Sequence, residues 1–170
     1  MCSFADIIRK ASYEDIPAIR DMAQVVFRDT YRDILSPGQM EYMMDMMYSE
    51  DSMSRQMEEL GHMYFIEDGK GYVSFRFDGR DEDGTDVFHL EKLYVMPGCR
   101  GEGIGRALFG TIVHNVRALS AGPARLELNV NRLNPAVGFY EHLGMRKARS
   151  GDFPIGRGFY MNDYIMSMNL

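Results

Sequence analysis

One arginine and three glycines, set between an apolar strand pattern and an amphipathic helix pattern, form the segment best suited to bind a ligand. They are Arg100, Gly101, Gly103 and Gly105. The first N–H groups of a helix have no intrahelical partner and can converge on an anion. Glycine lets the backbone approach a bulky phosphate, and Arg100 adds a fixed positive charge. The pattern therefore predicts a site for a diphosphate-bearing ligand.

The spacing of these glycines excludes two common nucleotide-binding motifs. The dinucleotide motif GxGxxG, counted from Gly101, would need its third glycine where Arg106 stands. The Walker motif, counted from Gly105, would need a lysine where Thr111 stands. The order Arg-Gly-x-Gly-Ile-Gly after a Leu-Tyr-Val strand instead resembles the coenzyme A loop of the GCN5-related N-acetyltransferases (GNAT). A glycine-rich connection without a ligand is the alternative interpretation.

A second segment, residues 134–145, carries the same resemblance. It is similar to the family pattern at Asn134, Ala136, Tyr140 and Gly144, while Met145 replaces the usual aromatic residue. The resemblance implies that acetyl-CoA is the cosubstrate and that its pantetheine lies between two parallel strands that splay apart. The residues implied to contact coenzyme A are Leu93, Tyr94, Val95, Arg100, Gly101, Gly103, Ile104, Gly105, Arg106, Asn131, Asn134 and Tyr140.

The resemblance also implies the chemistry, in which an amine attacks the thioester directly and coenzyme A thiolate leaves. Tyr140 would protonate the thiolate, since a phenol with a pKa of ~10 keeps its proton at neutral pH. Glu91 occupies the family's usual base position and would take the ammonium proton directly or through water. A packing role for Tyr140 and a solvated strand position for Glu91 are the alternatives. His89 and His142 are weaker candidates.

The remaining pattern predicts the elements that position these residues. Strand alternation places Glu91 on one face with His89, Leu93 and Val95. Helices are expected at 16–27, from Pro37, at 51–60, at 104–119 and at 134–143, and strands at 7–10, 63–66, 72–77, 87–95, 126–130, 145–150 and 159–168, with a glycine- and proline-containing loop over 151–158. One α/β (α+β) domain over residues 1–170 follows, with a mixed, mostly antiparallel sheet of about seven strands and helices on both faces.

The acceptor is less defined by the sequence. The segment from Phe27 to Tyr31, the methionine-rich helices and the ending from Asn162 resemble the bacterial polyamine (spermidine/spermine) acetyltransferases. Six acidic residues lie in the region that walls the family's acceptor site: Asp29, Asp33, Glu41, Asp45, Glu50 and Asp51. They would suit a cationic small-molecule amine, or they are ordinary solvated helix faces. A protein lysine or N-terminal acetyltransferase and a non-catalytic acyl-CoA-binding module are the other interpretations.

Composition excludes several classes of partner. The 170 residues carry a formal net charge of −6, which argues against nucleic acid. No apolar run approaches the ~20 residues of a membrane span, and the N-terminus does not read as a signal peptide. Cys2 and Cys99 are too few for a disulfide framework or a metal site. A cytoplasmic enzyme without a metal is expected, and the resemblance implies a homodimer as the common assembly.

Overall fold

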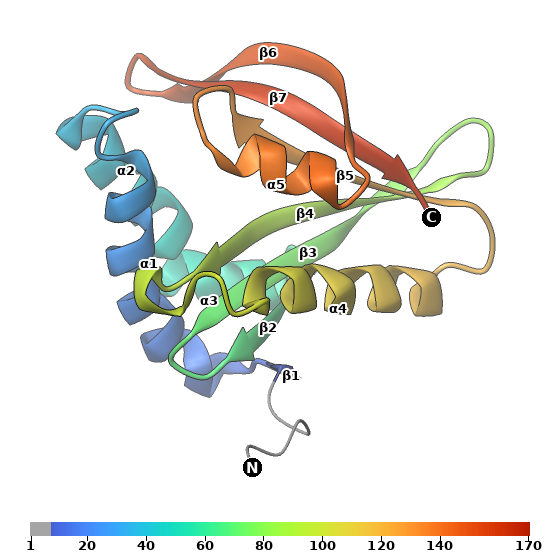
Figure 1. Cartoon of the computed structure of the whole chain (residues 1–170), viewed down its shortest axis with the longest axis horizontal. Coiled ribbons are helices and arrows are strands. Elements are labelled where there is room, and N and C mark those ends of the chain that lie inside the picture. Colours follow the sequence, from blue (N-terminus) through green and yellow to red (C-terminus); the bar gives the residue numbers. More distant parts are fainter. Residues whose placement is uncertain (1–7) are drawn as a thin grey trace.

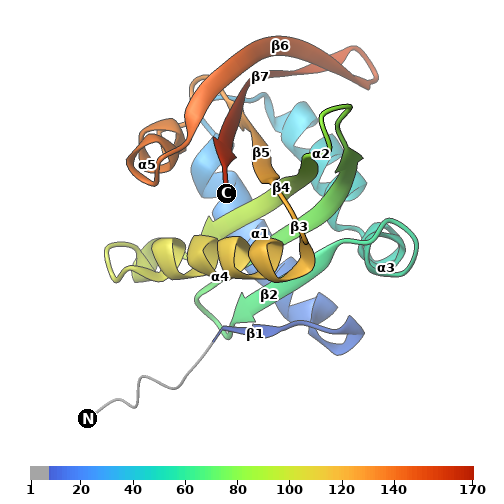
Figure 2. The same ribbon diagram turned by 90° about the vertical axis from the view of Figure 1, so that its right-hand side faces the viewer.

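Seven strands form one mixed sheet with α-helices on both faces (Figures 1 and 2), as the sequence predicts. The computed structural model describes residues 8–170. The strands are β1 (Ile8–Lys10), β2 (Met63–Glu67), β3 (Gly71–Arg80), β4 (Asp86–Val95), β5 (Ala124–Asn131), β6 (Arg146–Gly156) and β7 (Phe159–Asn169). The α-helices are α1 (Ile16–Tyr31), α2 (Pro37–Tyr48), α3 (Glu50–Glu58), α4 (Ile104–Leu119) and α5 (Ala136–His142).

The sheet separates two hydrophobic cores. Helices α4 and α5 cover one face, where Leu108 and Ile112 of α4 are fully buried against strand residues such as Leu126. Helices α1, α2 and α3 cover the other face, where Ile19 and Phe27 of α1 are fully buried. Figure 2 shows the two helix layers on opposite sides of the strands. Within residues 8–170 no helix is long and apolar enough to cross a bilayer.

The strand order is β1-β2-β3-β4-β5-β7-β6, and β4–β5 is the parallel pair while the other pairs are antiparallel. Strands β4 and β5 are paired from Asp86 opposite Ala124 to Leu90 opposite Leu128. Beyond Leu90 their register ends, although β4 continues along β3 and β5 continues along β7. The two strands therefore splay apart, and backbone groups that face the gap are left without a strand partner.

A β-bulge interrupts β4 where this gap opens. Ser74 of β3 lies opposite Lys92, and the next residue, Phe75, lies opposite Leu90, so Glu91 is the extra residue. The bulge shifts the alternation by one: Leu90 and then Leu93 pack on the α4 side. The expectation that His89, Glu91, Leu93 and Val95 share one face is therefore wrong.

The C-terminal hairpin is longer than the sequence predicts. The expected loop over residues 151–158 is wrong, because β6 continues through Gly151 and Pro154 and the turn is confined to Arg157 and Gly158. Pro154 is tolerated because β6 is an edge strand, where a missing N–H breaks no second ladder. Strands β6 and β7 form a curved ribbon at this edge of the sheet (Figure 1).

Candidate active site

A cavity of about 660 Å³ occupies the gap between β4 and β5, and we call it the interstrand cleft. It is lined by residues 29–31, 90–95, 99–101, 103–106, 129–130, 134–136 and 139–140. All residues predicted to contact coenzyme A line this cleft except Asn131. The Asn131 side chain instead accepts a hydrogen bond from the Leu133 backbone N–H at 2.9 Å. Asn131 thus stabilises the turn that leads into α5.

The glycine turn takes a left-handed conformation at two positions. Gly101 has φ +86° and Gly103, the residue before α4, has φ +81°. A Cβ atom at either position would meet nothing within 4 Å, so the backbone conformation itself requires glycine there. Gly105 differs, because a Cβ there would lie 3.3 Å from the Phe139 ring. The turn therefore places the free N–H groups at the start of α4 beside the cleft, with α5 packed close behind.

Arg100 lines the cleft and forms an ion pair with Asp29. Its Nη1 atom is 2.7 Å from the Asp29 carboxylate, and Asp29 also lines the cleft. The Arg100 side chain is 48% exposed, so it can turn toward a ligand at the rim. The sequence indicates the cation but not this partner, because 71 residues separate the two positions. A bound anion would have to share Arg100 with Asp29.

Glu91 lies at the bulge and contacts two basic side chains. One of its oxygens is 2.6 Å from Nε of Arg76 and 3.2 Å from Nδ1 of His89. Burial by itself raises the pKa of Glu91, but the interactions with His89 and Arg76 outweigh it and lower the pKa to about 2. Glu91 is therefore ionised over the whole neutral range, and its affinity for a proton is low.

A polar chain continues from His89 across the gap to β7. His89 Nε2 lies 3.0 Å from the Asn129 amide oxygen, and the Asn129 amide nitrogen donates to Asp163 at 3.3 Å. Asp163 is 1% exposed, and burial raises its pKa. Sequence reasoning missed Asn129 and Asp163, since an alternating strand pattern treats such residues as solvent-facing. The chain links β4, β5 and β7 through side chains at the end of the paired stretch of β4 and β5.

Tyr140 lies on α5 with its ring against Phe139, at a centroid distance of 5.3 Å. The side chain is buried and lines the interstrand cleft. Burial raises the pKa of Tyr140, and the nearby Tyr31 contributes to the same shift. The phenol is consequently neutral at all working pH values and is a hydrogen-bond donor.

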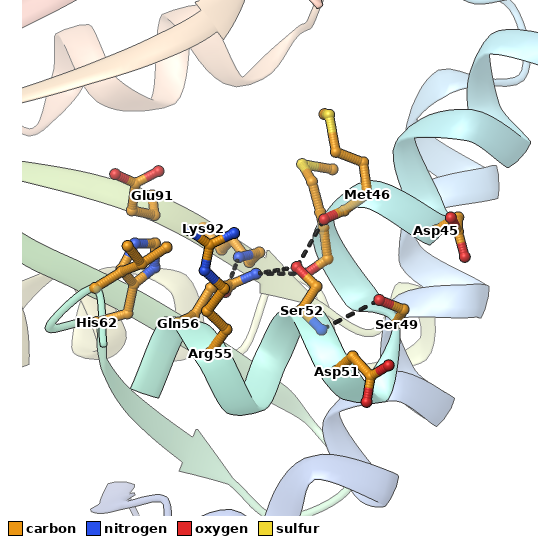
Figure 3. A pocket seen from close by; sticks show the side chains of 12 residues that line it. Asp45, Met46, Ser49, Asp51, Ser52, Arg55, Gln56, His62, Glu91 and Lys92 are labelled. Carbon is orange, nitrogen blue, oxygen red and sulfur yellow. Dashed lines mark hydrogen bonds between the residues drawn. The ribbon is translucent and has the colours of Figure 1, made fainter. Parts of the chain in front are cut away.

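A second cavity of about 570 Å³ lies between α2, α3 and β4, and we call it the helical pocket (Figure 3). Its lining consists of Asp45, Met46, Met47, Ser49, Asp51, Ser52, Arg55, Gln56, Leu60, His62, Glu91 and Lys92. Glu91 and Lys92 also line the interstrand cleft. The β4 bulge is therefore a wall common to both cavities.

Lys92 is a further charged residue that sequence reasoning missed. It is 6% exposed, and its Nζ donates to the Gln56 amide oxygen and to the Tyr64 hydroxyl, each at 2.8 Å. The ammonium lies 5.3 Å from the ring centroids of Tyr48 and Tyr64. Burial lowers the pKa of Lys92 to about 8, although the Glu91 charge acts in the opposite direction. The sequence does not reveal this position, because regular alternation would place Lys92 on the α4 side with Leu90. The bulge turns Lys92 toward the α1–α3 side instead.

The acidic residues of the N-terminal helices are placed unevenly. Asp45 and Asp51 line the helical pocket, and Asp29 pairs with Arg100 at the interstrand cleft. The others line neither cavity and are exposed: Asp33, Glu41 and Glu50. His142 is exposed as well and lines neither cavity. The structure thus brings together Glu91, Tyr140 and the glycine turn, and leaves His142 outside.

A family model and a curated relative match this chain. The acetyltransferase (GNAT) domain model matches residues 31–158. An uncharacterised N-acetyltransferase of Mycobacterium tuberculosis is 33% identical over 118 residues, which cover 63% of this chain and 72% of the relative.

Solved structures resemble the whole fold. The PaiA N-acetyltransferase of Thermoplasma acidophilum in complex with coenzyme A superimposes with a TM-score of 0.70 at 21% identity, covering 96% of this chain and 98% of that one. A GCN5-related N-acetyltransferase of Rhodopseudomonas palustris gives a TM-score of 0.77 at 20% identity, covering 100% and 99%. NAA60 of Arabidopsis thaliana, in complex with a bisubstrate analogue, gives 0.68 at 16% identity, covering 96% and 98%.

Proposed function

The chain belongs to the GNAT acetyltransferase family, and from this premise we propose that it acetylates a primary amine of a small molecule with acetyl-CoA. One observation carries the proposal: the interstrand cleft and the helical pocket share Glu91 and Lys92. A thioester in the cleft and an amine in the pocket would meet at the β4 bulge. Transfer then needs no covalent intermediate on the protein.

In this proposal the glycine turn holds the diphosphate of acetyl-CoA. The left-handed residues Gly101 and Gly103 direct backbone N–H groups at the start of α4 toward the phosphates, and Arg100 supplies charge. Pantetheine carries two amides and would pair with the unpartnered strand edges near Leu93 and Val130, as an inserted strand does. The coenzyme A complex of the similarly folded Thermoplasma acidophilum protein supports the fit of the cofactor to this fold.

The reaction begins with an ammonium ion that must lose a proton, since a primary amine has a pKa of ~10. The neutral nitrogen attacks the thioester carbon, the carbonyl oxygen gains charge, and a backbone N–H stabilises it. The C–S bond then breaks and the thiolate takes up a proton. With its pKa of about 2, Glu91 is a weak base; its main contribution is to attract the ammonium and orient the water that accepts the proton.

Tyr140 is the proposed donor to the leaving sulfur. Its raised pKa keeps the hydroxyl protonated, so the O–H is present throughout the reaction. The same shift makes full proton transfer to a thiolate of ordinary pKa ~8.5 costly, so a hydrogen bond that strengthens as charge develops is the main effect. Tyr140 thereby favours the transition state over bound acetyl-CoA.

The alternatives differ in the acceptor they require. A peptide substrate would need an extended groove, whereas the helical pocket is a side-chain-lined cavity of about 570 Å³. Polyamines remain candidate small-molecule acceptors, with Asp45 and Asp51 as the acidic wall. A binding module without turnover has no need of Glu91 and Tyr140 at the same cleft. These features favour a small amine over a protein.

Acetyl-CoA-dependent thiol release with a panel of small amines, amino acids and short peptides tests the proposal. We expect release with at least one small amine or amino acid at a higher kcat/KM than with any peptide. Tyr140→Phe is the matched control, because it keeps the ring and should suppress release. Turnover with peptides alone, or tight coenzyme A binding without any turnover, would contradict the proposal.

A further inference from the structure

We propose that the acceptor carries a carboxylate beside its amine, as an amino acid does, and that Lys92 binds this carboxylate in the helical pocket. The inference rests on the proposed function, because it names the class of amine that the enzyme acetylates. It assigns the positive charge at the pocket wall to substrate recognition. The amino group would then lie next to Glu91, the adjacent residue, which lines both the helical pocket and the interstrand cleft.

The hydrogen bonding of Lys92 is incomplete within the described part of the protein. An ammonium has three N–H donors, and protein groups accept two of them: Gln56 Oε1 and Tyr64 Oη, each at 2.8 Å. The Tyr64 hydroxyl in turn donates to Gln56, which is itself 6% exposed. These contacts fix the position of Nζ on the wall of the pocket. One donor is left for a ligand.

The positive charge of Lys92 is not neutralised by a neighbouring side chain among the residues that the structure describes. Within residues 8–170 Lys92 forms no ion pair, whereas the neighbouring Glu91 carboxylate is already held by Arg76 and His89. Aromatic rings of Tyr48 and Tyr64 flank the ammonium but do not neutralise it. A buried charge without a counterion destabilises the free enzyme, and a bound anion would remove that penalty. A monoanion such as a carboxylate matches the single free donor.

Basic and acidic groups are distributed unevenly along the helical pocket. His62, Glu91 and Lys92 lie at one end and Asp45 and Asp51 at the other (Figure 3). Nδ1 of His62 is buried without a hydrogen-bond partner in the described chain. Burial lowers the pKa of His62 to about 4, so its imidazole is neutral at pH 7. Next to the bulge a ligand thus meets the Lys92 cation and a neutral imidazole, beside the Glu91 carboxylate.

The same distribution argues against a polycationic acceptor. A polyamine that reaches the bulge would place positive charge beside Lys92, with Arg55 in the same pocket, and like charges repel more strongly where water is excluded. The carboxylates of Asp45 and Asp51 lie at the far end of the pocket, away from Lys92 (Figure 3). Arg55 is paired with Glu59 at 3.2 Å, so it contributes less than Lys92. Met46, Met47 and Leu60 supply apolar surface that suits the side chain of an uncharged amino acid.

Matched acceptor pairs test the inference: methionine against 3-(methylthio)propylamine, leucine against isoamylamine, and lysine against cadaverine, with spermidine added. For wild type we expect a kcat/KM at least tenfold higher for the carboxylated member. Lys92→Met should reduce this ratio to about one while acetyl-CoA affinity stays within twofold. Lys70→Met is the control, since Lys70 is exposed and lines neither cavity, and it should leave the ratio unchanged.

The outcomes separate the inference from the proposed function. Faster acetylation of the decarboxylated members or of spermidine would overturn the inference and leave the proposed function in place. Absence of turnover with every small amine, with coenzyme A still bound, would overturn both. If Lys92→Met folds poorly, Lys92→Gln serves in its place, because it keeps a donor near Gln56. A carboxylate preference that survives both substitutions would overturn the assignment to Lys92.

Discussion

The interstrand cleft and the helical pocket meet at the β4 bulge but are built in different ways. The cleft is formed by backbone: two strands that part after Leu90, left-handed glycines at Gly101 and Gly103, and the start of α4. The pocket is formed by side chains from α2, α3 and β4. A backbone-built site depends on the fold and suits a cofactor common to a family. A side-chain-built site changes with single substitutions and suits recognition of one acceptor.

The two cavities also differ in how they treat charge. In the cleft, Arg100 already has Asp29 at 2.7 Å and is half exposed. In the pocket, Lys92 is buried with two neutral hydrogen-bond partners. Substitutions at the cleft should therefore change cofactor affinity moderately, and substitutions at the pocket should change acceptor choice and stability.

The largest effect is expected at Tyr140, which lies on the cleft side. Tyr140→Phe keeps the ring packed against Phe139 and deletes the hydroxyl, so the rate of one acetyl transfer should fall ~10²–10⁴-fold. Acetyl-CoA affinity should change by less than about 1 kcal/mol, because the lost interaction forms in the transition state. Rapid-quench measurement of a single turnover avoids masking by product release. A wild-type rate would make Tyr140 a packing residue.

The next effect concerns Glu91, at the common wall. Glu91→Gln should slow turnover by about 10²-fold near pH 7 and progressively less as pH rises, because the amine then arrives neutral. With its pKa at about 2, Glu91 stays ionised throughout the assay, so the profile reflects the amine. The pH dependence of kcat/KM for both enzymes is the measurement. Parallel profiles would move the role to another group.

Substitutions at the glycine turn should weaken cofactor binding by a smaller factor. Arg100→Ala removes a charge-assisted contact, and about 1.5 kcal/mol, or roughly tenfold in affinity, should be lost. Gly103→Val should have a similar or larger effect because it forces a branched residue into φ +81°. Gly110→Ala is the control, with open space and no left-handed φ. Calorimetric titration with coenzyme A decides, and unchanged affinity in a folded Gly103→Val variant would contradict the assignment.

The smallest effect is on stability and concerns Lys92. Its pKa is lowered from 10.5 to about 8, so between those values the unfolded chain holds a proton that the folded chain has released. The contribution of Lys92 to wild-type stability should therefore rise with pH across that window. The rise is clearest from about pH 8 to 9, because the buried tyrosines, whose pKa values are raised above 10, act in the opposite direction at higher pH. Lys92→Met should abolish the rise and stabilise the protein by about 1–2 kcal/mol at pH 7, after loss of two hydrogen bonds. Urea unfolding at several pH values measures the free energy of unfolding and its dependence on pH. The same pH dependence in wild type and Lys92→Met would contradict a lowered pKa of Lys92.

The sequence predicts the backbone-built cleft better than the side-chain-built pocket. The order of strand and helix patterns along the chain predicts the seven-stranded sheet. The glycine turn and the segment from Asn134 are local patterns, and they predict most of the residues that line the cleft. The bulge at Glu91 depends on the pairing of β3 with β4. The position of Lys92 in the lining of both cavities therefore has no local signal in the sequence. The sequence underestimates the length of β6, because Gly151, Pro154 and Gly156 are typical of a loop, although an edge strand tolerates them.

In the proposed reaction the acceptor reaches the thioester from the helical pocket. Met46→Trp tests it most directly, because Met46 lines the pocket, is partly exposed and is absent from the cleft. For Met46→Trp we expect at least a tenfold fall in kcat/KM for the amine, with coenzyme A affinity within twofold of wild type. Val25→Trp, an exposed position on α1 that lines neither cavity, should change neither value. Unchanged amine kinetics in Met46→Trp would contradict binding of the acceptor in the helical pocket.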